Sequence, residues 1–281
     1  MLVLSDIRKA FGATVAVDGL SLRVQPEEIL GLLGPNGAGK TTTMSIATGL
    51  LPPDSGTVSI AGEGSPREAR VRRRLGLAPQ SIALYDDMSA RENLLFFGRL
   101  YGVDSAHAGG RIESLLARVG LLERQHERVK GYSGGMKRRL NLAAALVHDP
   151  PLVLLDEPTA GVDPHSRNAI LDLVRALRAE GRTVIYSTHY MEEAQRVCDR
   201  VAILDHGRLL ALDTVPRLIA AHGSRPVVVV EHPEGERRIE TGEPLKEIAR
   251  LLDEGLEHPV RLEKPDLESV FLNLTGRRLR D

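Results

Sequence analysis

The pattern of apolar and polar positions near the start of the chain predicts short strands followed by a helix. Residues 2–7 and 16–24 have the apolar content of strands, with turn signals around Gly12 and Gly19. The apolar run 29–33 then enters a glycine-rich loop, after which residues 41–50 follow a helical period. We therefore expect an N-terminal antiparallel β part that leads into a strand–loop–helix unit.

A second alternation of strand and helix occurs in the middle of the chain. Residues 152–155 are apolar without alternation, which is typical of a strand buried on both faces. A helix is expected at 167–179, ended by Gly181, and another strand at 183–187. We therefore predict an α/β fold with a mixed or mainly parallel sheet covered on both faces.

Between these two parts the pattern is helical. Residues 89–122 carry apolar side chains at helical spacing, and a second helix is expected at 134–148, stopped by Pro150 and Pro151. These stretches predict a helical subdomain at about residues 82–150.

The last part of the chain has a different pattern and predicts a small β/α appendix. Strands are expected at 227–231 and 260–262 and a helix at 245–252. A terminal helix is expected at 267–274, with Asp266 as its N-cap and Gly276 beyond its end. We place the domain boundary near Gly223-Ser224, which gives a main domain of residues 1–222 and an accessory domain of residues 223–281.

The glycine-rich loop Gly34-Pro35-Asn36-Gly37-Ala38-Gly39-Lys40-Thr41 fits the P-loop pattern. Its glycines allow consecutive backbone N–H groups to face one point, at which the following helix also aims its positive end. Lys40 adds a charge for the β- and γ-phosphates, and the Thr41 hydroxyl can bind Mg²⁺. A chance match is the alternative, but the loop lies between a predicted strand and a helix, as the motif requires.

Acidic residues follow the buried strand at 152–155. Asp156 occupies the position where P-loop proteins hold Mg²⁺, and the adjacent Glu157 can polarise the attacking water. His189 follows the strand at 183–187, where an imidazole could reach the γ-phosphate. Taken alone, the acids could be helix caps and His189 a structural surface residue. Their position beside a P-loop favours catalysis.

Ser133-Gly134-Gly135, within Tyr132-Ser133-Gly134-Gly135-Met136, resembles the signature motif of ATP-binding cassette (ABC) proteins. Other elements resemble that family in the same order along residues 2–213. Phe11 matches the adenine-stacking aromatic, Gln80 the glutamine that binds Mg²⁺, residues 160–163 the loop that crosses the dimer interface, and His189 the switch histidine. Phe11 replaces the usual Tyr and keeps the ring face. Tyr132 and Met136 replace the usual Leu and Gln of the signature.

The resemblance implies a set of site residues and a dimer. It implies catalytic roles for Glu157, His189 and Gln80, and Mg²⁺ ligands at Thr41, Gln80 and Asp156. The implied ATP-binding residues are Phe11, Val17, Asn36, Gly37, Ala38, Gly39, Lys40, Thr41, Thr42, Ser133, Gly134, Gly135 and Asp156. Each ATP would lie between the P-loop of one cassette and the signature of a second, head-to-tail cassette, and we expect a homodimer.

Composition narrows the setting in which such an ATPase would work. The 281 residues carry 37 Lys and Arg against 38 Asp and Glu, a net charge of −1, which does not favour a nucleic-acid partner. The one cysteine, Cys198, is consistent with a reducing compartment. No signal peptide and no apolar run of about 20 residues is found, so we expect a peripheral protein on the cytoplasmic side of the cell membrane.

The resemblance extends to one branch of the family. Residues 188–194, the tail 267–276 and the signature look like drug and polysaccharide exporters, whose cassettes pair with a separate transmembrane permease. Tyr85 is expected to contact that partner, whereas Phe96 and Phe97 could equally fill the core of the helical subdomain. Two alternatives are a soluble ABC ATPase acting on ribosomes or nucleic acid, and a nucleotide-binding regulator without turnover.

Overall fold

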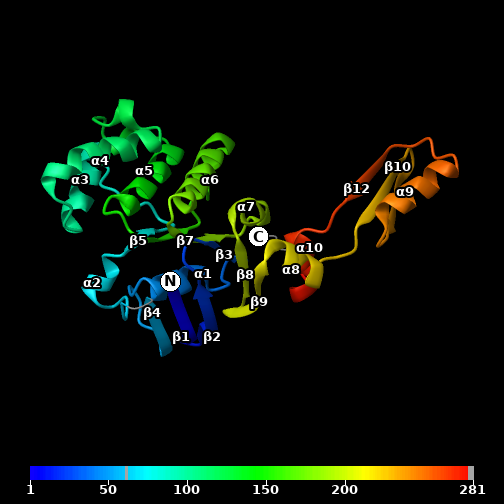
Figure 1. The fold of residues 1–281 in the computed structure, drawn as a ribbon, viewed down its shortest axis with the longest axis horizontal. Helices are drawn as coiled ribbons and strands as arrows, with labels where there is room; N and C mark the ends of the chain where they lie inside the picture. The colour runs from blue at the N-terminus through cyan, green and yellow to red at the C-terminus, as the bar shows by residue number, and fades with distance from the viewer. Residues whose placement is uncertain (61–62, 278–281) are drawn as a thin grey trace. The chain divides into compact units, whose positions relative to one another are not determined.

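The computed structural model describes residues 1–60 and 63–277. The chain divides into two compact units, one from Met1 to Leu212 and a second that begins at Asp213 (Figure 1). None of the helices in the described ranges is long and apolar enough to cross a membrane.

The first unit is built on a six-stranded sheet with the order β5-β6-β7-β3-β8-β9. Its strands are β3 (Ile29–Leu33), β5 (Leu75–Ala78), β6 (Leu152–Asp156), β7 (Thr183–Thr188), β8 (Arg200–Asp205) and β9 (Arg208–Thr214). The first five strands of the sheet, β5, β6, β7, β3 and β8, pair in parallel with their neighbours. Every residue of β3, β6 and β7 is buried. The predicted parallel core is confirmed. The hydrophobic pattern of the sequence did not predict β5, because a strand of four residues is too short to show a period.

A second sheet in this unit is antiparallel, with the order β2-β1-β4. It consists of β1 (Leu2–Phe11), β2 (Thr14–Val24) and β4 (Ser55–Ile60). Its buried leucines share a hydrophobic core with β3 and with helix α1 (Lys40–Ala47). The predicted N-terminal β part is confirmed, and it lies on the far side of the unit from helices α3, α4 and α5 in Figure 1.

The helical part contains α3 (Ala90–Leu100), α4 (Ser105–Arg118) and α5 (Gly134–Leu146), with short 3₁₀ turns at Leu122–Arg124 and Val129–Gly131. The short helix α2 (Ala69–Arg72) instead places Val71 in the core shared with the N-terminal β part. The single helical stretch expected at 89–122 is wrong, because the chain turns between α3 and α4. Gly102 has a φ of +80° there, a backbone conformation that ends a helix.

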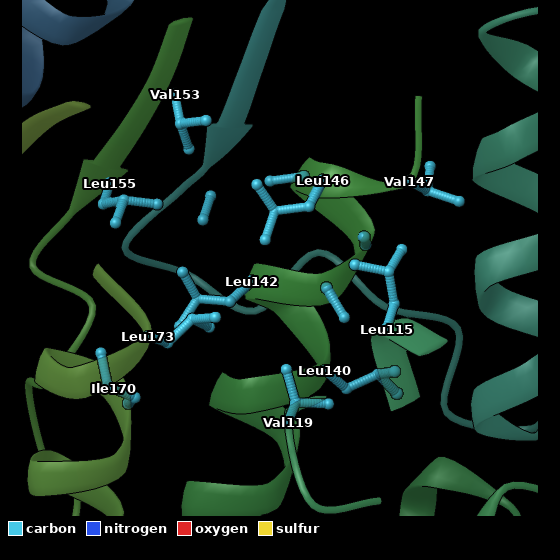
Figure 2. Packing of buried hydrophobic residues seen from close by; sticks show 14 of the residues in the cluster. Leu115, Val119, Leu140, Leu142, Leu146, Val147, Val153, Leu155, Ile170 and Leu173 are labelled. Atoms are coloured by element: carbon cyan, nitrogen blue, oxygen red, sulfur yellow. The ribbon is translucent and has the colours of Figure 1, made fainter. Parts of the chain in front are cut away.

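Helix α5 lies at the centre of the larger hydrophobic core. Figure 2 shows its Leu140, Leu142 and Leu146 facing side chains from α4, from β6 and from helix α6 (Pro164–Ala179). The helix that carries the signature residues is thereby fixed against both the sheet and the helical part. A further helix, α7 (Met191–Val197), follows β7.

The second unit contains a three-stranded antiparallel sheet with the order β11-β10-β12. Its elements are α8 (Val215–His222), β10 (Val227–His232), β11 (Gly235–Glu240), α9 (Pro244–Asp253), β12 (Val260–Glu263) and α10 (Leu267–Thr275). Asp266 caps α10 by accepting from Ser269 N, and Gly276 ends it with a φ of +71°. Residues 278–281 of the expected accessory domain lie outside the described residues.

The two units divide at a different point from the boundary expected near Gly223. Helix α8 packs on α10, and Asn273 Nδ2 donates a hydrogen bond of 2.8 Å to His222 O. Residues 213–222 therefore belong to the second unit. The sequence did not indicate this, because the contact joins segments far apart in the chain.

Candidate nucleotide-binding site

The parallel sheet brings four chemically important segments to one edge. Its register pairs Leu33 with Thr188, Asp156 with Ser187, and Ala78 with Leu155. The residues that follow these strand ends are the P-loop, Glu157, His189 and Gln80, so the topology alone places them near one another. Ligands of open parallel sheets bind at this edge.

The P-loop joins β3 to α1 in a backbone conformation that requires glycine. Gly39, the N-cap of α1, has a φ of +95°. A Cβ at this position would lie 2.3 Å from Ala16 O, so even a strained alanine would not fit without moving β2.

A pocket of about 520 Å³ opens in front of this loop. It is lined by Phe11, Thr14, Val15, Ala16, Pro35, Asn36, Gly37, Ala38, Gly39, Lys40, Thr41, Thr42, Gln80 and Glu157. The ring of Phe11 is 53% exposed and therefore available for stacking. The structure thus brings most of the expected nucleotide-binding residues to one pocket.

Val17 does not fit its expected role, because its side chain is 1% exposed and lies in the core. Val15, which is 54% exposed, lines the pocket instead. Lys9 pairs with Val17 and Ala10 with Val15, so Ala16 is an extra residue that breaks the alternation of β2. A sequence pattern does not show such a bulge, and for this reason Thr14, Val15 and Ala16 were missed.

Lys40 is the cation at the centre of the site. Its Nζ donates hydrogen bonds of 2.7 Å to Gly34 O and 3.0 Å to Pro35 O, and lies 3.1 Å from Glu157 Oε1. Both side chains of this ion pair are buried. The P-loop lysine and the acid after β6 are therefore in direct contact.

Glu157 also meets the other two expected catalytic residues. Gln80 Nε2 donates to its Oε2 over 3.2 Å, and His189 Nδ1 lies 3.3 Å from the same oxygen without hydrogen-bond alignment. Burial is the largest single effect and acts to raise the pKa of Glu157, but the charge and hydrogen bonding of Lys40 and the smaller effects of His189 together outweigh it, and the pKa is lowered. Glu157 is therefore held as a carboxylate.

The backbone of Glu157 is unusual, with a φ of +45° in the left-handed region. Ser187 holds it there, since its Oγ accepts from Glu157 N at 2.9 Å and donates to Asp156 Oδ1 at 2.6 Å. Strained residues of this kind are concentrated at functional sites.

Thr41, Gln80 and Asp156 together line an adjoining pocket of about 390 Å³. Their oxygen atoms, from a hydroxyl, an amide and a carboxylate, are the donors that Mg²⁺ prefers. Within residues 1–60 and 63–277 there is no group of three or more His, Cys, Asp and Glu side chains placed so that they could hold a metal ion by themselves. These residues therefore fit an ion that is shared with substrate phosphates rather than enclosed by the protein.

The signature residues lie at a different helix start. Ser133 caps α5, its Oγ accepting from Met136 N at 3.3 Å, and both Ser133 and Gly134 are exposed. Neither they nor Gly135 line the pocket in the part of the chain that the structure describes. The structure thus does not bring the signature and the P-loop together within one chain.

The unusual signature residues Tyr132 and Met136 have clear contacts. Both are buried, and both meet Arg124, whose O accepts from Tyr132 OH at 2.7 Å and whose Nη1 lies 3.3 Å from Met136 Sδ. The guanidinium lies 5.6 Å from the ring centre of Tyr132. The two replacements therefore form one packing unit beneath the signature and leave Ser133 and the glycine amides in place.

Sequence reasoning missed Arg138, which joins two segments of the site. The side chain is buried and donates to Gln80 O and, over 3.2 Å, to Ala160 O. Asn141 lies one turn later and donates to Pro79 O at 3.2 Å. Polar residues at i and i+3 on the apolar face of α5 were the signal that could have revealed this contact.

The geometry defines a P-loop nucleotide-binding protein, with a phosphate cradle, a lysine and acidic residues at the end of a parallel sheet. The ABC transporter family profile matches residues 17–160. The linearmycin resistance ATP-binding protein LnrL of Bacillus subtilis (strain 168) is 40% identical, with 100% of both chains covered. The Nod factor export ATP-binding protein I of Paraburkholderia xenovorans (strain LB400) is 42% identical, with 98% of this chain and 97% of that protein covered.

Solved structures agree with this assignment. The ATP-binding subunit of an ABC transporter superposes with a TM-score of 0.72 at 30% identity, covering 78% of this chain and 92% of that chain. A dimeric ATP-binding cassette in a post-hydrolysis state with ADP and Pi has a TM-score of 0.70 at 25% identity, covering 76% and 98%. The chain belongs to the ABC transporter family. It is an ATP-binding ATPase subunit of the exporter type, and the soluble alternative is not favoured.

Proposed function

We propose that two copies of this chain bind two ATP molecules head to tail, and that hydrolysis drives a separate transmembrane permease. The observation that carries this proposal is the separation of the two anion sites. The pocket at Lys40 holds the groups proposed to act on phosphate, whereas Ser133 and Gly134 are exposed residues at the start of α5. A helix start of this kind attracts an anion, and a second chain can supply one.

Within each site the described contacts suggest a division of roles. Phe11 stacks on adenine, and the P-loop amides with Lys40 hold the phosphates. Thr41, Gln80 and Asp156 would hold Mg²⁺, which neutralises charge that develops on the transferred phosphoryl group.

Glu157 would accept a proton from the attacking water. Gln80 and His189 orient it through their contacts with Oε2. When Lys40 turns to the phosphates, the Glu157 oxygen that it contacts becomes available to water. His189, beside the same carboxylate, can then reach the γ-phosphate.

The permease would dock on the helical part. Tyr85 is 48% exposed and its ring lies 4.8 Å from that of Phe96, which is 38% exposed. Phe97 packs partly against the core, so it serves the subdomain itself. We propose that Tyr85 and Phe96 contact the permease at the cytoplasmic face of the membrane.

The two relatives named above carry different compounds in their names, linearmycin resistance and Nod factor export, at nearly equal identity to this chain. Selectivity is therefore expected to lie in the permease.

Phosphate release measured over a range of protein concentrations tests the shared site. We expect the rate per subunit to rise with concentration and then to level off, because a lone cassette lacks one half of each site. A rate per subunit that stays constant down to the most dilute sample would contradict the proposal. Purification of the tagged chain from detergent-solubilised membranes should bring a stoichiometric polytopic protein with it, and ribosomes or DNA in its place would contradict transport.

A further inference from the structure

Glu193, the third residue of α7, is a buried carboxylate with no role in the steps above. Its side chain is almost fully buried, whereas its neighbour Glu192 on the same helix is exposed. A buried charge is costly unless hydrogen bonds compensate for it, so its partners indicate its role.

One oxygen of Glu193 accepts three hydroxyl groups. Its Oε2 lies 2.9 Å from Thr159 Oγ1, 2.8 Å from Tyr186 OH and 2.9 Å from Thr188 Oγ1. All three donors are buried. Thr159 lies after β6, Tyr186 lies within β7 and Thr188 is the last residue of β7, so the Glu193 Oε2 atom joins three positions of the chain.

Thr188 connects this atom to the switch histidine. Its Oγ1 accepts from Tyr190 N at 2.9 Å, so the two residues that flank His189 are joined to each other. A second connection runs through Arg167, whose Nε lies 3.4 Å from Glu193 Oε1. The guanidinium carbon of Arg167 lies 4.6 Å from the ring centre of Tyr190, and the rings of Tyr190 and His189 are 4.1 Å apart between centres. The orientation of His189 therefore depends on groups that Glu193 holds.

Thr159 connects the same atom to the loop that leads into α6. Its O accepts from Val162 N at 3.3 Å, and the next residue, Ala160, is held by Arg138. Asp163 ends this loop as the N-cap of α6, accepting from Ser166 N at 2.9 Å. Residues 160–163 are the segment expected at the dimer interface.

We propose that Glu193 is a positioning residue that couples the loop 160–163 to His189. A displacement of the loop by a second chain changes the position of Thr159, and the shared carboxylate oxygen transmits the change to Thr188. This inference rests on the proposed roles of His189 and of the dimer. An apolar side chain could fill this space without the cost of burying a charge, so simple packing does not account for a carboxylate here.

The test uses the full chain with Thr159→Val and Thr188→Val, which keep the shape of each residue and remove one hydroxyl. We expect each change to lower kcat for ATP hydrolysis about tenfold, with KM for ATP nearly unchanged. The double variant should lose much less than the product of the two effects, because both act through Glu193. Multiplicative effects, with no coupling between the two threonines, would overturn the proposal.

Glu193→Ala and Glu193→Gln complete the test, with Glu192→Ala as the matched control. In the Glu193→Ala background the threonine changes should have no further effect, and Glu193→Gln, which keeps an acceptor, should recover part of kcat. Tm and ATP binding are measured on the same samples, and a loss of kcat explained entirely by the unfolded fraction would refute a positioning role. If Glu193→Ala does not fold, the comparison of the two single threonine variants with the double variant still tests the coupling.

Different experimental results would reject the inference about Glu193 and the proposed function. Equal kcat for Glu193→Ala and the control, in an active wild-type background, rejects only the coupling. A wild-type chain without ATP hydrolysis rejects the function on which the coupling rests.

Discussion

The Lys40 ammonium lies 3.1 Å from the Glu157 carboxylate, and the two side chains are only 4% and 6% exposed. One residue begins α1 and the other follows β6, so the contact depends on the order of strands in the sheet. The pair joins the group that binds phosphate to the group proposed to act on water.

The ion pair predicts a pH-dependent effect of Lys40→Met. A carboxyl whose pKa is lowered in the folded state contributes stability above its unfolded pKa, and this contribution is lost as the pH falls through the folded pKa. We therefore expect Lys40→Met to lower the Tm of the first unit clearly at about pH 7 and much less near pH 3. Lys246→Met, which removes an exposed pair with Glu243, is the control. A Tm difference that is independent of pH would argue against the pair.

Glu157→Gln should nearly abolish hydrolysis and preserve ATP binding. The amide cannot accept the proton of the attacking water, so we expect kcat to fall by about 10²-fold or more. Size-exclusion chromatography with ATP should show a persistent dimer, because the nucleotide at the interface is not cleaved. Glu192→Gln on the exposed face of α7 should behave as the wild type. Hydrolysis by Glu157→Gln at the wild-type rate would show that another group is the base.

Ser133→Arg should separate ATP binding from dimer formation. Ser133 is exposed at the start of α5 and outside the pocket of its own chain. A long cation there would block the approach of a second chain, so we expect unchanged ATP affinity at low protein concentration and no ATP-dependent dimer. Ser224→Arg, at an exposed position of the second unit, serves as control. An equal loss of binding in the monomer would exclude the two-chain site.

Gly135→Ala and Gly134→Ala should differ sharply although they are neighbours. A Cβ on Gly135 would lie 2.5 Å from Ser166 Oγ, whereas a Cβ on Gly134 has no atom within 4 Å. We expect Gly135→Ala to cost about 1–3 kcal/mol through overpacking between α5 and α6. Thermal unfolding of the two variants and of Gly135→Ala combined with Ser166→Ala measures this effect. The combined variant should recover stability, and failure to do so would place the strain elsewhere.

Phe11→Ala should weaken ATP binding and Phe11→Tyr should not. The ring is exposed at the mouth of the pocket, and its face is the only group there suited to stacking among the pocket residues. Loss of stacking is expected to cost about 0.5–1.5 kcal/mol in binding free energy, measured by calorimetry. Unchanged affinity in Phe11→Ala would mean that adenine lies elsewhere.

The sequence by itself determined the chemistry of this protein. The P-loop, the acid pair after an apolar strand and the signature are local patterns, because each depends on the backbone conformation or on neighbouring residues. Lys40 and Glu157 were selected in this way, Gln80 and His189 also through the family resemblance, and the sheet brings the four together. The apolar runs also indicated the parallel core, because burial on both faces leaves no alternation.

Only the tertiary structure decided the features that depend on distant contacts. The bulge at Ala16 buries Val17 and exposes Val15, and the contact of α8 with α10 moves the boundary between the units. The hydroxyl cluster at Glu193 and the bridge at Arg138 join segments that are not adjacent in the chain. Such pairings follow from strand register and helix packing, so a single sequence can mark a polar residue on an apolar helix face, as at Arg138, but does not name its partner.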